Sequence, residues 1–214
     1  MVTRFFRRLR RGSPIVVVSG LPRSGTSMAM KMLEAGGVPI VTDGIRTADE
    51  SNPKGYYEFE RVKELDKNGD TAWLGEARGK AVKIISFLLT YLPDTYDYHV
   101  VFMNRDVDEV LASQNKMLVA RGEATDTADD AKMREVYGKH LEKVGRFLRS
   151  RSCFTTLQVR YRDVIDNPAA EARRLNEFLG GRLNVEQMSA VADRELYRNR
   201  KTNPESRIMN PESR

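Results

Sequence analysis

The stretch IVVVSGLPRSGTS constrains the fold more than any other part of the 214-residue sequence. Its β-branched run over residues 15–19 is closed by Gly20 and predicts a short, buried, parallel strand. Residues 24–35 then place apolar side chains on one helical face and stop at Gly36-Gly37, which predicts a helix. A strand, a glycine-containing turn and a helix in direct succession indicate an α/β fold.

The rest of the chain continues this alternation of short apolar runs and amphipathic segments. Three further strands are predicted, at 81–85, 99–103 and 154–159. Amphipathic patterns predict three further helices, at 107–119, 131–149 and 168–179. Pro168 stands in the first helical turn, where proline is favoured. We therefore expect a three-layer α/β/α fold with a mainly parallel central sheet.

The formal net charge of +6 is concentrated at the start of the chain. Five arginines lie there with no acidic residue among them, at Arg4, Arg7, Arg8, Arg10 and Arg11. The chain is therefore predicted to consist of a basic arm over 1–12, one domain over 13–200 and a polar, disordered tail over 201–214. Peripheral contact of the arm with an anionic membrane or nucleic acid is one interpretation, and a solvated arm is the other.

Composition limits the class of protein. The mean hydropathy is −0.53, and no stretch approaches the roughly 18 apolar residues of a spanning helix, so we expect a soluble, cytoplasmic protein. The single cysteine, Cys153, excludes an internal disulfide and a multi-cysteine zinc site, and we expect it to pack in a core. Residues 42–56 are rich in turn formers and predict a long loop, for which we hypothesise a substrate-covering role.

The loop between the first strand and helix has the composition of an anion-binding loop. Gly20 and Gly25 let the backbone turn tightly, so that N–H groups converge at the positive end of the helix dipole. Thr26 and Ser27 add hydroxyl groups, and Arg23 adds a permanent cation. A nucleoside-triphosphate P-loop has lysine where this chain has Thr26, so we expect an anion other than the γ-phosphate of ATP. From this motif alone, a plain strand-to-helix turn is the alternative.

The segment GLPRSGTS resembles the 5′-phosphosulfate loop of the sulfotransferases that use 3′-phosphoadenosine 5′-phosphosulfate (PAPS), enzymes with a P-loop NTPase-like fold. In that family the loop reads proline, a basic residue, serine, glycine and two hydroxyl residues. The matching positions here are Pro22, Arg23, Ser24, Gly25, Thr26 and Ser27. The resemblance implies that these residues bind the donor, with Arg23 in the role of the P-loop lysine.

Two later segments resemble the same family. VVFMNRDVDEVLASQNKM is similar to the 3′-phosphate segment, in which a serine follows a strand-end arginine by eight positions, as Ser113 follows Arg105. An arginine and a serine so spaced can converge on one anion, and a helix cap with an ordinary ion pair is the alternative for the Arg-Asp pair taken alone. Residues 159–180 resemble the late strand and helix. There Tyr161 matches a tyrosine beside the nucleotide, and Arg162 replaces a common acid.

The resemblance also implies catalytic residues for an in-line sulfuryl transfer that needs no metal. Arg23 would neutralise the leaving group. Lys83 is similar to a strand-end lysine that acts at the leaving phosphate, but Ile85 stands where cytosolic members have a catalytic histidine. NPKGYYEFE resembles a segment of bacterial relatives, and Glu58 is our candidate base, with a structural ion pair or a substrate contact as alternatives.

Some positions depart from the family pattern. Met28 replaces an aromatic residue that stacks on adenine. The family's glycine-rich element near the C-terminus is not recognisable, and basic residues at Arg198, Arg200 and Lys201 are the weak candidates to replace its charges. His99 and His140 are expected to be structural.

We therefore expect a sulfotransferase that uses PAPS and acts on a hydroxyl or amine of a small molecule, sugar or lipid. No specific nucleic-acid partner is expected, and the oligomeric state stays open. One alternative is a small-molecule kinase with a degenerate P-loop, which would need magnesium and Asp106 as its metal ligand. The other is a non-enzymatic nucleotide-binding module whose basic arm sits on a membrane or nucleic acid.

Overall fold

The computed structural model describes residues 11–44, 57–67, 69–120, 122–123 and 130–192. Within these ranges, four strands form one sheet of order β2-β1-β3-β4, and every neighbouring pair is parallel. The strands are β1 (Ile15–Gly20), β2 (Ala81–Lys83), β3 (Tyr98–Asn104) and β4 (Phe154–Arg160). β1 lies in the interior of the sheet, and all six of its residues are buried.

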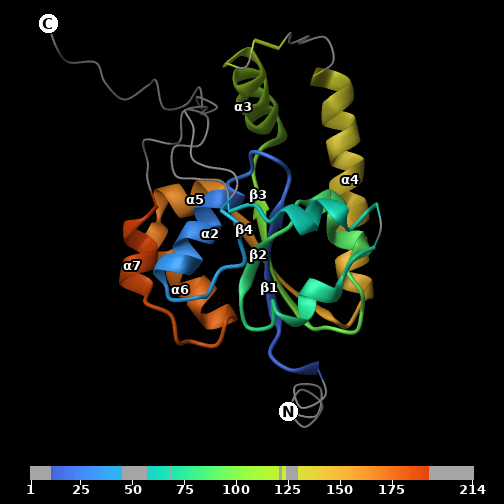
Figure 1. The fold of residues 1–214 in the computed structure, drawn as a ribbon. Helices are drawn as coiled ribbons and strands as arrows, with labels where there is room; N and C mark the ends of the chain where they lie inside the picture. Colours follow the sequence, from blue (N-terminus) through green and yellow to red (C-terminus); the bar gives the residue numbers. More distant parts are fainter. Residues whose placement is uncertain (1–10, 45–56, 68, 121, 124–129, 193–214) are drawn as a thin grey trace, which may run out of the picture.

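Helices cover both faces of the sheet (Figure 1). One face carries α2 (Thr26–Ala35), α5 (Tyr161–Asp166), α6 (Pro168–Phe178) and α7 (Val185–Ala190). The other carries α4 (Asp130–Ser150) and three 3-10 helices, η1 (Glu60–Glu64), η2 (Ala72–Gly75) and η3 (Ser86–Tyr91). A further helix, α3 (Val107–Ala120), extends beyond the carboxyl ends of the strands. The arrangement confirms the expected three-layer α/β/α fold with a parallel sheet.

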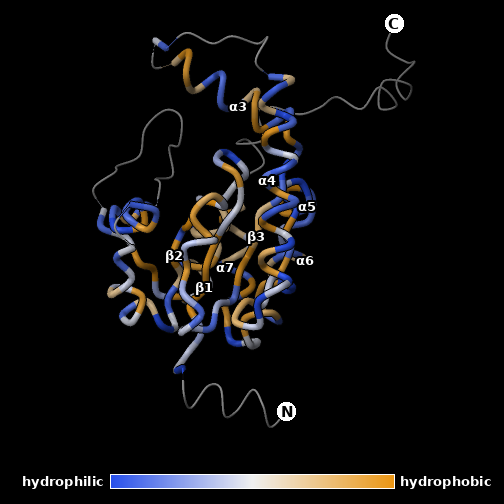
Figure 2. The backbone as a smooth tube through the Cα atoms, turned by 90° about the vertical axis from the view of Figure 1, so that its right-hand side faces the viewer, coloured by the Kyte–Doolittle hydropathy of each residue, from blue (hydrophilic) through white to orange (hydrophobic). Residues whose placement is uncertain are grey.

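The alternation of side chains along β1 divides the hydrophobic core in two. Ile15 and Val17 belong to the core beneath α4 and the 3-10 helices, which also contains Cys153. Val16 and Val18 belong to the core beneath α2, α5, α6 and α7. In Figure 2 the strands between these layers are mostly hydrophobic, whereas α4 has long hydrophilic stretches. A strand flanked by two cores has to be apolar on both faces, which explains the unbroken apolar run at the start of the sequence.

Two element boundaries differ from the sequence-based expectation. The helix expected from residue 24 begins at Thr26, because Gly25 has a φ of 98°, in the left-handed region that a right-handed helix excludes. The strand expected over 81–85 ends at Lys83. The N–H of Ile84 still donates to the carbonyl of Val18 at 3.0 Å, but the chain then turns into η3.

Short helices account for the elements that the sequence patterns do not predict. α5 and α7 have six residues each, and η1, η2 and η3 have six or fewer, too few for a helical period to repeat. Most of the loop expected over 42–56 lies outside the described residues. In the part of the chain that is described, every helix is too short or too polar to cross a membrane.

Candidate functional site

The loop between β1 and α2 lies at the carboxyl edge of the sheet and depends on two glycines. At Gly20, φ is 151°, and a Cβ would lie 2.5 Å from Ser24 Oγ and 2.6 Å from the carbonyl oxygen of Met103. At Gly25, φ is 98°, and a Cβ would lie 2.3 Å from Cδ2 of Tyr161. Any larger residue at either position would displace its neighbours, so the loop requires glycine at both.

Polar groups of this loop fit an oxygen-rich ligand. Ser24 Oγ is buried and has no hydrogen-bond partner among the described residues, and the same holds for Ser19 Oγ at the end of β1. α2 begins with Thr26 and Ser27 and has no acidic residue in its first turn. Buried hydroxyls are normally satisfied, so an unpartnered one beside the N-terminus of a ten-residue helix fits a phosphate-like group. Pro22 is half-buried at the other end of the loop.

The structure brings the predicted 3′-phosphate segment onto this loop. β3 pairs with β1 so that Met103 lies opposite Gly20, and the residues after β3 therefore reach the loop. Arg105 Nη1 donates to the carbonyl oxygen of Arg23 at 3.2 Å. Arg23 Nε donates to Ser113 Oγ, in α3, at 3.1 Å. The two arginines and the serine are therefore parts of one connected site.

Arg105 is enclosed by protein groups on several sides. Its Nε lies 3.1 Å from Glu109 Oε2, and each of these two side chains is 8% exposed. Its guanidinium carbon lies 4.5 Å from the centre of the Tyr161 ring, a cation–π contact. The same ring is the group against which Gly25 packs. Tyr161 thus lies where the loop and the 3′-phosphate segment meet.

Glu109 is the residue of this site that the sequence interpretation did not single out. A signal for it exists, because Glu109 lies in the first turn of a predicted helix and follows Arg105, just before that helix, by four positions, the spacing at which acidic and basic side chains pair. On an exposed helix such a pair is common and of little consequence. The burial of both side chains is a property of the tertiary structure, and that is what makes the pair significant here.

Asp106 is a helix cap in the structure. Its Oδ1 accepts hydrogen bonds from the N–H groups of Asp108, at 2.9 Å, and Glu109, at 3.3 Å, as an N-cap residue does. The helix-cap interpretation of Asp106 is therefore confirmed, and the binding of an anion by Arg105 stays a prediction. The aspartate starts α3, and the arginine beside it contacts the loop.

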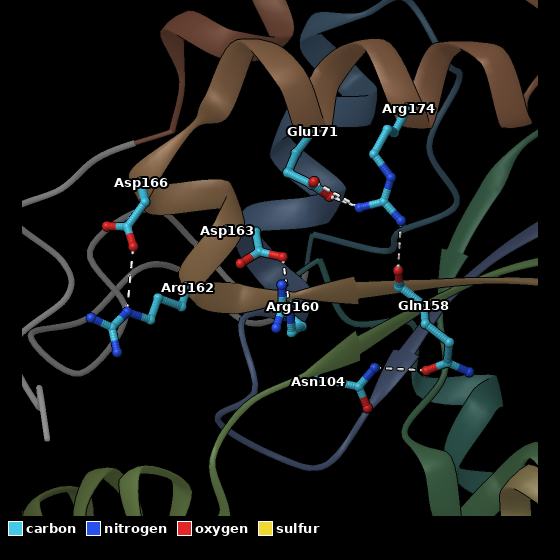
Figure 3. A network of polar contacts seen from close by, with 8 residues as sticks. All are labelled: Asn104, Gln158, Arg160, Arg162, Asp163, Asp166, Glu171 and Arg174. Carbon is cyan, nitrogen blue, oxygen red and sulfur yellow. Dashed lines mark hydrogen bonds and ion pairs between the residues drawn. The ribbon is translucent and has the colours of Figure 1, made fainter.

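Arg162 lies outside the connected site. It pairs with Asp166 of α5 at 3.4 Å, and its side chain is 63% exposed. Figure 3 shows this pair and the neighbouring pair of Arg160 and Asp163, in which Nε and Oδ2 are 2.7 Å apart. The charge of Arg162, which replaces an acid common in the family, is thus balanced by Asp166 at the surface.

The candidate catalytic residues Lys83 and Glu58 lie next to each other. β2 pairs with β1 so that Lys83 lies opposite Val18, two residues before the loop begins. Lys83 Nζ is 3.8 Å from Glu58 Oε1, and Lys63 Nζ is 3.6 Å from Glu58 Oε2. The backbone carbonyl of Glu58 accepts a hydrogen bond from Thr42 Oγ1 at 2.9 Å. The carboxylate therefore lies between two ammonium groups, beside the end of β2.

The two histidines lie in packed surroundings. The ring centre of His99 in β3 is 5.3 Å from that of Phe178. In α4, His140 Nε2 is 2.8 Å from Ser86 Oγ, and its ring stacks on Phe87 with centres 3.7 Å apart. Burial, followed by the charge of Lys143, lowers the pKa of His140. Both histidines hold elements together, which is the structural role expected for them.

Other positions considered from the sequence can be placed as follows. Met28 is half-buried and packs against the core beneath α2. Arg198, Arg200 and Lys201 lie outside the described residues. Among the residues that are described, no three His, Cys, Asp or Glu side chains gather as a metal site would require.

Comparison with known proteins identifies one family. A family model described as "Sulfotransferase domain" matches residues 13–213. A solved sulfotransferase from Mycobacterium tuberculosis is 16% identical, with a TM-score of 0.58, covering 88% of this chain and 74% of its own. The sulfotransferase domain of a Synechococcus olefin synthase is also 16% identical, with a TM-score of 0.50 and coverages of 86% and 80%. No curated protein sequence matches. The solved structures show a shared fold, which is P-loop NTPase-like.

Proposed function

The chain belongs to the sulfotransferase domain family, and we propose that it transfers a sulfuryl group from PAPS to a hydroxyl or amine of a small-molecule, sugar or lipid acceptor. The observation that carries the choice of donor is the connected site of Arg23, Arg105 and Ser113. PAPS has anionic groups at both the 3′ and the 5′ position of its ribose, and a molecule of that kind needs two cationic groups close together.

Each end of the donor is assigned to one half of the site. The 5′-phosphosulfate would be held by Pro22, Arg23, Ser24, Gly25, Thr26 and Ser27. The Ser24 hydroxyl, which has no hydrogen-bond partner in the described part of the chain, and the α2 N-terminus would be the anion ligands. Arg105 and Ser113 would hold the 3′-phosphate. Tyr161, which contacts both halves, would lie beside the nucleotide.

Separate residues would neutralise the leaving group and accept the proton of the acceptor. PAPS supplies an activated sulfuryl group whose bond to the 5′-phosphate breaks as the acceptor oxygen or nitrogen attacks. Arg23 and Lys83 would neutralise the charge that builds on the leaving phosphate oxygens. Glu58 would accept the proton of the acceptor. Its carboxylate lies 3.8 Å from Lys83 Nζ, so base and leaving-group cation are neighbours.

The kinase alternative is disfavoured by the position of its expected metal ligand. It requires Asp106 to coordinate magnesium, but Asp106 Oδ1 accepts hydrogen bonds from two backbone N–H groups as the cap of α3.

The non-enzymatic alternative depends on the basic arm, of which residues 1–10 lie outside the described part. Arg11, the last arginine of the arm, donates from Nη1 to Asp97 Oδ1 at 3.1 Å. We therefore favour the sulfotransferase with PAPS as donor.

Transfer from labelled PAPS to a panel of hydroxylated and amine acceptors tests the proposal. We expect wild-type protein to label at least one acceptor, and Arg105→Ala to lower that rate about 100-fold or more, because it removes a preorganised cation from the donor site. Arg162→Ala is the matched control, since it removes an exposed arginine that pairs with Asp166 at the surface. Wild-type activity of the Arg105→Ala variant would contradict the proposed donor site. So would transfer of a phosphoryl group from ATP with no sulfuryl transfer from PAPS.

A further inference from the structure

We propose that Glu109 is a positioning residue, which holds Arg105 as a brace between the two ends of the donor site and so keeps the phosphosulfate loop in its transfer geometry. The inference rests on the proposed donor, because the two ends are defined by PAPS. The position of the Glu109 carboxylate is unexpected for an anion site. A buried carboxylate lies 3.1 Å from the arginine that is expected to bind the 3′-phosphate, where it opposes the binding of an anion.

The contacts of Arg105 show what this carboxylate achieves. The guanidinium is held at Nε by Glu109, at Nη1 by the carbonyl oxygen of Arg23, and on its face by the Tyr161 ring. A planar guanidinium engaged in these three directions has little freedom to rotate. The arginine is therefore a fixed strut between α3, α5 and the loop.

The carbonyl that Arg105 contacts belongs to a strained part of the loop. Arg23 has a φ of 67°, in the left-handed region that residues with a Cβ disfavour. The peptide after it is bonded at both ends, since the carbonyl of Arg23 accepts from Arg105 and the N–H of Ser24 donates to the carbonyl of Leu21 at 3.2 Å. Arg105 thus fixes the peptide that leads into Gly25 and the α2 N-terminus.

Glu109 keeps Arg105 in this position when an anion attracts it. The backbone of Glu109 is itself fixed, because its N–H donates to the capping Oδ1 of Asp106 at 3.3 Å. Without the Glu109 carboxylate, a 3′-phosphate would draw the guanidinium away from the carbonyl of Arg23, and the loop would lose its support. Donor binding would survive this change, whereas transfer at the opposite end would slow.

The test is the separation of kcat from KM in Glu109→Gln, which keeps the size of the side chain and removes its charge. We expect kcat with PAPS to fall about 10- to 100-fold, as for a misplacement of about an ångström in a reacting site. We expect the KM for PAPS and the calorimetric Kd for 3′-phosphoadenosine 5′-phosphate (PAP) to stay within about threefold of wild type or to decrease, because a charge opposing the anion is gone.

Glu171→Gln is the matched control. Glu171 is also a buried glutamate in the first turn of a helix. Its Oε2 lies 2.6 Å from Nη1 of Arg174, an arginine of the same helix whose Nη2 donates to the carbonyl oxygen of Gln158 in β4 (Figure 3). We expect it to lower the thermal unfolding temperature and to leave kcat unchanged. A general effect of removing the charge of a buried glutamate that pairs with an arginine would lower kcat in both variants.

Each outcome decides between the proposals. If Glu109→Gln raises KM with kcat unchanged, or changes neither, the brace is wrong while the proposed function stands. If it lowers kcat no more than Glu171→Gln does, the effect is one of stability and the brace is again wrong. Should Glu109→Gln fail to fold, Glu109→Asp, which keeps the charge but is one methylene shorter, is judged by the same kcat and KM criteria. Failure of the wild-type protein itself to bind PAP would overturn the proposed donor instead.

Discussion

At the scale of single residues, the site depends on a few positions where only one type of residue fits. Gly25 combines a left-handed φ of 98° with a ring that a Cβ would approach to 2.3 Å. The sequence motif predicts the position of this glycine and a tight turn. It does not predict the ring of Tyr161 beside it, because the two residues are 136 positions apart and meet only through the parallel pairing of β1, β3 and β4.

Gly25→Ala is predicted to weaken PAP binding about 30-fold or more, since the loop must move to relieve the clash and several charge-assisted bonds are lost. Gly37→Ala is the control, because Gly37 has a φ of 93° with nothing within 4 Å of an added Cβ. It should cost about 1–2 kcal/mol of unfolding free energy and leave PAP affinity unchanged. Calorimetric titration with PAP measures both affinities, and denaturant unfolding measures the stability of Gly37→Ala. Equal PAP affinity of Gly25→Ala and wild type would rule out the steric requirement.

Glu58→Gln is predicted to lower the transfer rate about 100-fold or more, within the usual range for a general base, while PAP still binds. Glu60→Gln is the comparison, because Glu60 lies two positions away, is 47% exposed and shares the partner Lys63. It should keep nearly the full rate. A Glu58→Gln variant that transfers at close to the wild-type rate would remove Glu58 from the mechanism.

At the scale of elements, the sequence predicts what has enough residues to show a period or a pattern. In the described part of the chain, the sequence patterns match the four strands and the helices of ten residues or more to within two residues at each end. α5 and α7, with six residues each, were not predicted, because their position is fixed by packing rather than by a repeating pattern. The connected site follows from the order of the strands. Arg105 and Ser113 reach the loop because β3 pairs directly with β1, which the motifs imply but cannot establish by themselves.

The contact between α4 and η3 is predicted to make stability depend on pH. Burial lowers the pKa of His140 below its ordinary 6.5, so the folded protein binds this proton less readily than the unfolded chain does. The contribution of neutral His140 to the free energy of unfolding is fully present above pH 6.5 and is lost as the pH falls below that value. Denaturant unfolding at pH 7.5 and pH 5.5 should therefore show a larger loss of stability in wild type than in His140→Gln. An equal loss in both proteins would mean that this histidine does not titrate as its burial implies.

At the scale of the whole molecule, the fold places two cation-bearing segments at one edge of a parallel sheet. Ligand sites of open α/β sheets lie at the carboxyl ends of the strands, and the loop after β1 and the segment after β3 are both there. The two hydrophobic cores hold these strands rigidly from either face, so the site is built on fixed elements. What the family does not fix is the acceptor, since it depends on side chains around the site rather than on the loop.

Calorimetric titration of the wild-type protein with PAP and with ATP tests most directly whether Arg23 and Arg105 serve one molecule. We expect PAP to bind at least about tenfold more tightly than ATP, because only PAP offers a phosphate at the 3′ position to Arg105 and Ser113. Equal affinity for the two nucleotides would contradict a single site that spans both ends of a bisphosphorylated adenosine.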